Sequence, residues 1–211
     1  MTTLSELVTR CQARFRDTGG YTFLAEEWEA YLNEVYLSVV ASRPDWPFMQ
    51  TKSTAITFAP SATSMSLPAD AWRVSSVYNA TGKYPLVQID GPAQHIYLYP
   101  DPTASPGSPQ HFRVFARTIE LYPVPAESTD VVVEYSASPA ELTGADSPIF
   151  PAQYHQVLLH GALQHAYEDI GNLQQAKVHE GHRDRLVLAM QNDLFGPKHP
   201  EFPVLTDNFF G

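Results

Sequence analysis

Cysteine, long apolar runs and basic residues are all scarce in this 211-residue chain. The single cysteine, Cys11, excludes an internal disulfide framework, and its place on an apolar helix face favours a small buried side chain over a reactive thiol. No stretch approaches eighteen apolar residues, and the first residues lack the basic and apolar regions of a signal peptide. We therefore expect a soluble protein that is not addressed for secretion and binds no membrane.

Basic side chains are outnumbered throughout the chain. There are 13 Lys and Arg against 23 Asp and Glu, which gives a formal net charge of −10. Sites that grip phosphates need clustered Lys and Arg, and the sequence has no such cluster. Sequence-directed binding of DNA or RNA is therefore disfavoured, whereas an acidic wall past which DNA slides without sticking is compatible with the charge.

Proline is missing from two long segments. All 18 prolines fall between Pro44 and Pro151 or after Phe195, so residues 1–43 and 152–196 contain none. Both segments carry apolar residues at helical spacing, which predicts two helical arms around a β-rich insert. We expect an α+β fold: an antiparallel helical bundle of N- and C-terminal helix pairs, an inserted proline-rich antiparallel β module, and an extended C-terminal tail.

The expected boundaries follow from the prolines and turn residues. We place an N-terminal helical hairpin at 1–43, the inserted β module at 44–147, a C-terminal helical hairpin completing the bundle at 148–196, and the extended tail at 197–211. In the third segment the centre of the apolar stripe is small, so another helix can approach closely there. The predicted bundle core is Trp28, Tyr31, Leu32, Val35, Tyr154, Leu158, Gly161 and Ala162. A capping box at 3–6 is expected to start the first helix.

Short β-type runs separated by Pro, Gly, Ser and Asp predict an antiparallel meander or small sandwich in the insert. The predicted strands are 55–58, 64–67, 73–78, 84–89, 96–99, 112–116, 119–122 and 131–135. Runs 96–99 and 119–122 both end in Pro-x-Pro, and we interpret them as equivalent strand ends. Residues 100–111 are predicted to form an exposed, flexible loop.

Eight histidines raise a metal hypothesis that their spacing does not support. His155, His160 and His165 are five apart, which spreads them around a helix, and His179 and His182 are three apart. A metalloprotease helix places two histidines four residues apart with a glutamate after the first. We therefore interpret these side chains as surface or partly buried histidines bonded to their neighbours.

Other signatures of chemistry are missing too. The sequence has no Gly-x-Ser-x-Gly elbow, no phosphate-cradling glycine loop and no dinucleotide fingerprint, so we expect no enzymatic activity, no catalytic residue, no metal and no cofactor. Aromatic residues of the insert could stack on sugar rings, although the same residues are ordinary strand and core formers. A carbohydrate-binding β module on a helical scaffold is one alternative function, and a metal-dependent hydrolase is a third.

The C-terminal tail combines apolar side chains with residues that prevent a helix. Gly196-Pro197 ends the last predicted helix, and Pro200 and Pro203 favour an extended chain. The large apolar residues beyond that stop are Phe202, Val204, Leu205, Phe209 and Phe210. Exposed aromatic residues of this kind mark an interface. Docking on a partner is the preferred interpretation, and folding back over the chain's own helices is the alternative.

A series of short strings lies in order along nearly the whole chain. They are Leu4-Ser5-Glu6-Leu7-Val8-Thr9-Arg10, Trp28-Glu29-Ala30-Tyr31-Leu32-Asn33-Glu34-Val35-Tyr36, Pro44-Asp45-Trp46-Pro47-Phe48, Ser66-Leu67-Pro68-Ala69-Asp70 with Trp72-Arg73-Val74, Leu98-Tyr99-Pro100, Leu121-Tyr122-Pro123, and Ile149-Phe150-Pro151 leading to Tyr154 and residues 158–162. In order and spacing these strings resemble the head-to-tail connector (adaptor, neck) proteins of tailed bacteriophages.

The resemblance implies a structural virion protein of the phage neck, located in the virion after assembly in the host cytoplasm. It implies a homo-oligomeric ring below the portal, with an expected twelvefold symmetry, that connects the DNA-filled head to the tail. The partners implied are the portal protein, the next neck or tail protein and further copies of the chain, with DNA passing through the channel without specific binding. The tail with its five large apolar residues is then the portal-docking interface. A tail-completion or minor head protein is an alternative within the same class.

Overall fold

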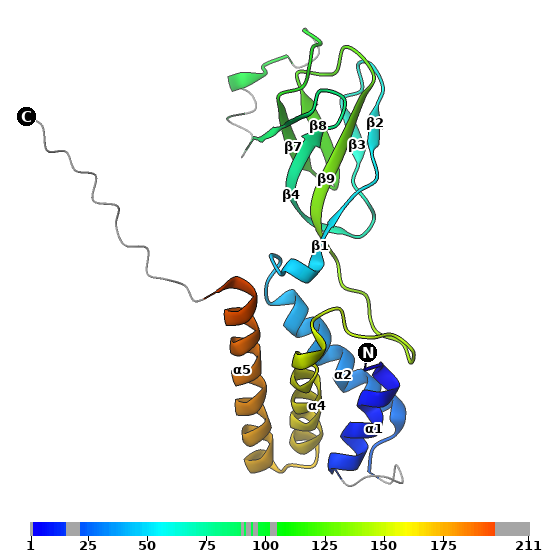
Figure 1. Ribbon diagram of the computed structural model, residues 1–211, viewed down its shortest axis with the longest axis vertical. Coiled ribbons are helices and arrows are strands. Elements are labelled where there is room, and N and C mark those ends of the chain that lie inside the picture. The colour runs from blue at the N-terminus through cyan, green and yellow to red at the C-terminus, as the bar shows by residue number, and fades with distance from the viewer. Residues whose placement is uncertain are drawn as a thin grey trace, which may run out of the picture. The chain divides into compact units, whose positions relative to one another are not determined.

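The computed structural model describes residues 2–15, 22–89, 91, 94, 97–101 and 105–196 of the chain. The chain divides into two compact units, a helical unit formed by Met1–Ser42 with Ala140–Gly211 and a β unit formed by Arg43–Pro139 (Figure 1). The predicted tail falls outside the described residues, as do 102–104 of the predicted loop.

One central helix organises the helical unit. The elements of this unit are α1 (Leu4–Phe15), α2 (Ala25–Ala41), the short 3-10 helix η2 (Ala152–Tyr154), α4 (Gln156–Asp169) and α5 (Leu173–Phe195). Helix α4 contacts α1, α2 and α5, and Figure 1 shows it between α5 and the α1–α2 pair. Its own sequence explains this place, because apolar residues surround much of it and eight of its fourteen residues are buried.

Local sequence signals set the ends of these helices. Thr3 Oγ1 accepts a hydrogen bond from the Glu6 N–H at 3.3 Å, which is one half of the predicted capping box. At the start of α2 the Glu27 carboxylate accepts from the Leu24 N–H at 2.6 Å. Asn172 caps α5 by accepting from the Gln175 N–H at 3.2 Å. Helix α5 ends at Gly196, whose φ of 72° belongs to the left-handed region that favours glycine.

The predicted antiparallel bundle of N- and C-terminal helix pairs is wrong, although the general α+β class holds. Helix α5 packs mainly against α4 and touches η2, so it does not close a four-helix arrangement with α1 and α2. Of its 23 residues only Ala176 and Met190 are buried, while Leu173 is 63% exposed. Charged and polar residues are distributed around most of α5, and its narrow apolar face packs mainly on α4.

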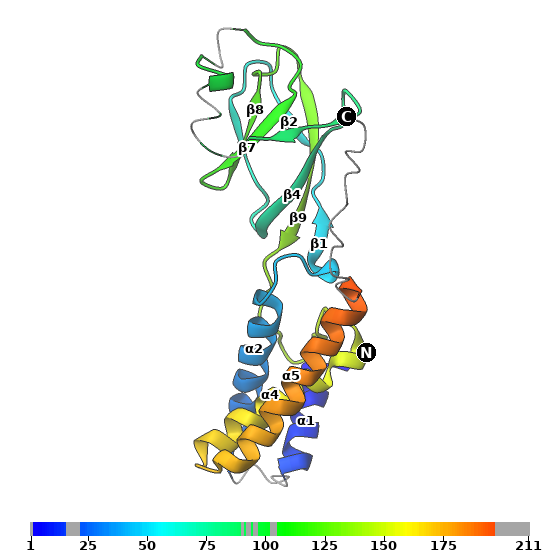
Figure 2. The same cartoon turned by 90° about the vertical axis from the view of Figure 1, so that its left-hand side faces the viewer.

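The β unit contains two sheets. Its strands are β1 (Gln50–Lys52), β2 (Ile56–Phe58), β3 (Ser64–Ser66), β4 (Ala71–Asn79), β5 (Tyr84–Pro85), β6 (Val87–Gln88), β7 (His111–Phe115), β8 (Thr118–Tyr122) and β9 (Thr129–Ala137), preceded by the 3-10 helix η1 (Pro47–Met49). One sheet has the order β1-β9-β4-β5, with β2 also paired to β9, and the other has the order β3-β8-β7-β6. The long strands β4 and β9 run side by side (Figure 2). All pairs are antiparallel except β6 with β7.

The core of the β unit lies between the two sheets. Alternate residues of β9 are buried, including Val131, Val133 and Tyr135, as the two-residue period of a strand requires. These side chains pack with Leu86, which lies between β5 and β6, and with residues from both sheets: Phe58, Val77, Phe112, Ile119 and Leu121. The arrangement is therefore a small sandwich, one of the two architectures expected from the short strands and frequent turns.

Two expectations about the middle of the insert are wrong. Within the predicted strand 96–99, Tyr97 and Leu98 are helical, so the two Pro-x-Pro runs are not equivalent strand ends. Residues 107–110 are not a free loop either. The Gly107 N–H donates to the Val124 carbonyl at 2.9 Å, the Gln110 N–H donates to the Tyr122 carbonyl at 2.8 Å, and Pro109 is buried. Backbone hydrogen bonds to Tyr122 at the end of β8 and to Val124 just after it hold this proline-rich segment, which composition alone does not reveal.

None of the helices among the described residues combines the length and the apolar character needed to cross a bilayer.

Candidate interaction surfaces

The predicted core residues of the helical arms differ little in their burial. Trp28, Leu32, Val35, Tyr154, Leu158, Gly161 and Ala162 are buried, and Tyr31 is half-buried. At the crossing of α4 with α2, a Cβ added to Gly161 would lie 2.5 Å from Val35 Cγ1. Only a glycine lets the two helices approach this closely, because any larger side chain would overlap the valine.

Side-chain hydrogen bonds join the helices at both ends of the unit. The Tyr31 hydroxyl of α2 donates to Asp169 at the end of α4, and its ring stacks on His165 with 5.9 Å between ring centroids. The Tyr154 hydroxyl of η2 donates to Asp193 of α5. Burial of Tyr31 and its bond to Asp169 raise the pKa of its hydroxyl, which therefore stays protonated as a donor.

The segment after the β unit is bound to the first two helices. The Asn33 side chain donates to the Leu142 carbonyl at 3.0 Å and accepts from the Leu142 N–H at 2.8 Å. Ser5 donates from both its N–H and its hydroxyl to the Gly144 carbonyl, at 3.1 and 2.9 Å. The chain therefore re-enters the helical unit along a path defined by paired hydrogen bonds.

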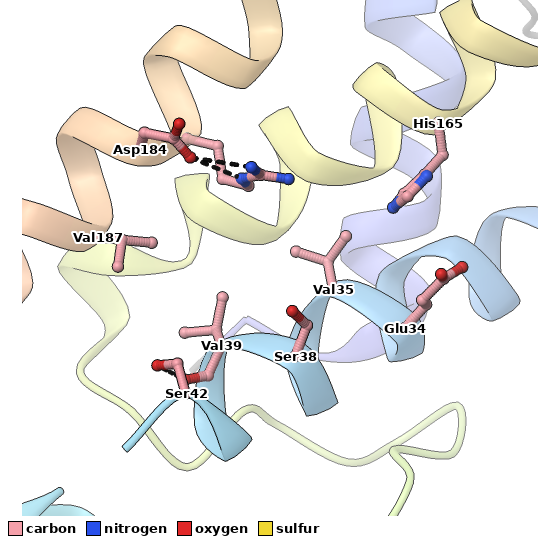
Figure 3. Close-up of a pocket in the computed structure, with 9 residues that line it drawn as sticks. Glu34, Val35, Ser38, Val39, Ser42, His165, Asp184 and Val187 are labelled. Atoms are coloured by element: carbon pink, nitrogen blue, oxygen red, sulfur yellow. Dashed lines mark hydrogen bonds and ion pairs between the residues drawn. The ribbon is translucent and has the colours of Figure 1, made fainter.

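A groove runs between α2 and α5 over α4. Its α2 wall is one helical face, Glu34, Val35, Ser38, Val39 and Ser42; His165 lies on α4, and Arg183, Asp184 and Val187 form the α5 wall (Figure 3). The space measures about 280 Å³. The groove exists because α5 packs on α4 and leaves the side toward α2 open. We name it the α2–α5 groove.

One arginine shapes the α5 wall of this groove. Arg183 Nη1 donates to Gln164 Oε1 of α4 at 2.7 Å, and its Nη2 donates to Asp184 Oδ1 at 2.9 Å. Figure 3 draws Val35, Val39 and Val187 facing the space between the two helices. The groove therefore combines apolar methyl groups with a fixed pair of charges at its edge.

Three histidines meet at the contact of α4 with α5. His160 Nδ1 lies 3.0 Å from His179 Nδ1, and the His160 ring stacks on that of His182 with 5.1 Å between centroids. Burial, the neighbouring His179, Arg14 and His182 lower the pKa of His160 to about 4. Burial and the neighbouring positive charges also lower the pKa of His179. Sequence spacing missed this cluster, since the members come from two helices whose pairing the spacing does not encode.

Among the described residues no group of three or more potential ligands is arranged to hold a metal ion. Cys11 is fully buried, and burial raises the pKa of its thiol to about 12, so it is a core residue without thiolate character at neutral pH.

The aromatic residues of the β unit divide between the sandwich core and the exposed surface. Phe58 and Phe112 belong to the sandwich core, whereas Trp72 and Phe115 are exposed.

The proposed portal-docking residues Phe202, Val204, Leu205, Phe209 and Phe210 lie outside the described residues. The described part of the chain ends at Gly196, which directly follows α5.

A family model described as SU10 adaptor protein matches residues 2–195. The chain therefore belongs to the SU10 adaptor protein family and is a structural adaptor protein of a bacteriophage, which confirms the resemblance seen in the sequence. No match is found among curated proteins. Family membership implies interaction with phage portal and tail proteins and a location in the virion neck.

Proposed function

We propose that this adaptor forms a homo-oligomeric ring below the portal and connects the DNA-filled head to the tail. Membership of the adaptor family over residues 2–195 is the observation that carries the proposal. The ring matches the twelvefold symmetry expected of the portal, and each subunit adds one modest contact to an assembly that gains from many at once. Subunits fold in the host cytoplasm and enter the virion as the neck is built.

The C-terminal tail supplies the contact with the portal. The family match ends at Phe195, so this role rests on the tail's own composition. Its three phenylalanines, with Val204 and Leu205, are large apolar residues within 15 residues of chain, 197–211. Each phenylalanine placed in a pocket of the portal would contribute roughly 1.5–3 kcal/mol by burial of apolar area. Several together offset much of the cost of ordering an extended segment, which is about 1–2 kcal/mol per residue held.

The channel of the ring passes DNA without binding it specifically. A net charge of −10 spread over the chain repels the DNA phosphates, so electrostatic attraction does not hold the DNA as it passes through the channel. This property suits a conduit, in which retention of DNA would oppose ejection.

Purified portal tests the proposal directly. Mixed with portal at micromolar concentration, the full chain should move into a high-mass complex measured by light scattering. A variant lacking 197–211 should keep the helix content and thermal midpoint of the full chain but fail to join that complex. Lys198→Ala serves as the matched control, because it alters the tail without removing an apolar side chain. Independent elution of portal and full chain would contradict the connector role, and undiminished portal binding by the truncated chain would contradict the role of the tail.

A further inference from the structure

Helix α5 has an exposed face that carries large apolar side chains. Val178, Gly181, Arg185 and Leu188 follow one another at spacings of three and four residues, so they lie along one side of the helix. Val178 is 48% exposed and Leu188 58% exposed, and a Cβ added to Gly181 would meet no atom within 4 Å. We name these four residues the outer face of α5. It lies opposite the buried side of the helix, which packs mainly on α4.

The spacing of the outer face is that of a helix–helix seam. Alternating steps of three and four residues place side chains where they insert between those of a second helix. Leu188 and Val178 supply the apolar side chains of this seam, and Arg185 between them supplies a charge that fixes the alignment of a partner. Because the buried side of α5 already contacts α4, the second helix must come from another chain.

The exposed face of α2 complements the outer face of α5. Ala30, Glu34, Ser38 and Ala41 lie along it and are all exposed. Their small side chains leave room for a leucine and a valine of the facing helix. Helix α2 has four glutamates and neither lysine nor arginine, so its charge is opposite to that of Arg185. Among the described residues neither Glu34 nor Arg185 belongs to an ion pair within the subunit.

The two faces lie where a head-to-tail contact between copies needs them. Figure 1 shows α4 between α5 and α2, and Figure 2 shows α2 and α5 running in the same direction. The α2–α5 groove places Glu34 and Ser38 of α2 level with Asp184 and Val187 of α5. Copies in a ring are related by rotation, which preserves level and direction when the ring axis runs along the helices. Arg185 of one copy then lies level with Glu34 of the next.

We propose that the outer face of α5 in one copy packs on the exposed face of α2 in the next copy, with Arg185 against Glu34. The proposal rests on the proposed ring and names the surfaces that form it. Each copy gives α5 to one neighbour and receives α5 of the other on α2. Such a contact joins two different surfaces, so it closes into a ring rather than ending at a dimer.

The size of the contact also favours a ring. Helix α5 has 23 residues, so it is roughly 34 Å long and about 10 Å wide and can cover roughly 340 Å² on each partner. The total of roughly 700 Å² lies below the ~1,000 Å² expected of a stable pairwise interface. Two isolated copies therefore bind weakly, and the contact persists where many copies are held together.

Disulfide trapping between separate full-length chains tests the contact. Ser38→Cys and Ala189→Cys are both exposed, four residues beyond Glu34 and Arg185, so parallel packing brings them together. The matched control replaces Ala189→Cys with Ala13→Cys, an exposed position of α1. The native Cys11 does not compete, because it is fully buried.

Mixed at submillimolar concentration under mild oxidation, Ser38→Cys and Ala189→Cys should form a disulfide-linked heterodimer at least about tenfold faster than the control mixture. Equal rates would overturn the proposal. Faster dimerisation of Ala189→Cys with itself would also overturn it, because α5 would then pack on α5 of the other copy.

Charge reversal in the same chains tests the central pair. Glu34→Arg in the Ser38→Cys chain, or Arg185→Glu in the Ala189→Cys chain, should slow trapping about threefold, the size expected of an exposed ion pair. Both reversals together should restore the rate to within about twofold. Arg10→Glu on α1 changes the net charge as Arg185→Glu does and should leave the rate nearly unchanged. A double reversal that restores nothing would overturn the pairing of Glu34 with Arg185.

Trapping uses the isolated protein, so its result is separate from that of the portal experiment. A complex with portal combined with trapping no faster than the control would overturn the α2–α5 contact and leave the connector role standing. Fast trapping combined with independent elution of portal and adaptor would support the contact and contradict the connector role.

Discussion

His160 of α4 and His179 of α5 face each other through their Nδ1 atoms, which lie 3.0 Å apart. One ring must donate and the other must accept, so the pair keeps its hydrogen bond only while at least one ring is neutral. Adding a second proton would place two N–H groups face to face beside His182 and Arg14, which oppose the extra charge. This contact between α4 and α5 is therefore sensitive to acid.

Acid should destabilise the protein through this pair. The pKa of His160 falls from 6.5 in the unfolded chain to about 4 in the fold, so below pH 6.5 the unfolded state binds more protons. The resulting stability is lost as the pH falls from 6.5 toward 4. Because the ring is partly exposed, we expect a loss of about 1 kcal/mol between pH 7.5 and pH 5, less than the full linkage value. His160→Gln should flatten thermal midpoints measured across this range, and His199→Gln in the tail should not. Identical pH profiles for all three proteins would contradict the role of the pair.

Alanine substitution should change stability in opposite directions at two glycines, Gly161 at the close crossing of α4 with α2 and Gly181 on the open surface of α5. Gly161→Ala should destabilise the protein by about 1–3 kcal/mol, because the new methyl group meets Val35 at 2.5 Å. Gly181→Ala, on α5 with nothing within 4 Å of its added Cβ, should stabilise it by up to ~1 kcal/mol through helix propensity. Chemical denaturation measures both. If adding Val35→Ala restores none of the stability lost in the Gly161→Ala variant, the destabilisation does not come from the contact between these two residues.

The paired hydrogen bonds of Asn33 with Leu142 should contribute measurably to stability. Asn33→Ala leaves the N–H and carbonyl of the largely buried Leu142 without this partner, which costs about 1–3 kcal/mol. Urea denaturation should record this loss. Asn192→Ala, at an exposed position of α5, should change stability by less than ~0.5 kcal/mol. Equal effects of the two substitutions would show that the bonds to Leu142 add nothing.

Replacing the first residue of the turn between β7 and β8 should make the protein more stable. Ala116 and Arg117 have φ values of 46° and 64°, which a two-residue hairpin turn requires but which side chains other than those of Gly, Asn and Asp disfavour. Ala116→Asn should raise stability by roughly 0.5–1 kcal/mol. The same exchange in a helix, Ala189→Asn, should lower it by up to ~0.7 kcal/mol. A drop in thermal midpoint for Ala116→Asn would refute the strain argument.

Duplex DNA should not bind the isolated protein. Repulsion between a chain of net charge −10 and the phosphates is strongest at low salt, where the Debye length is about 30 Å at 0.01 M. Gel shifts at low ionic strength should show no retardation. A saturable shift that weakens with added salt would reveal a basic surface that the overall charge conceals.

Local features of this fold were readable from the sequence because they depend on neighbouring residues. The start of α1 follows from Thr3 and Glu6, which lie within one turn. The alternation in β9 follows from residues two apart, Val131, Val133 and Tyr135. Family resemblance was readable for the same reason, since it rests on the order of short strings. The apolar content of the tail is likewise a property of the sequence itself.

The tertiary structure alone decided which surfaces meet. Periodicity identifies the apolar face of a helix but not the element that covers it, so the packing of α5 mainly on α4, and with it the α2–α5 groove, could not be predicted. His160 and His179 are 19 residues apart and become neighbours only through that pairing. Composition likewise predicted a free loop where backbone hydrogen bonds to Val124 and Tyr122 hold Gly107 and Gln110. In each case long-range contacts supplied free energy that no local pattern records.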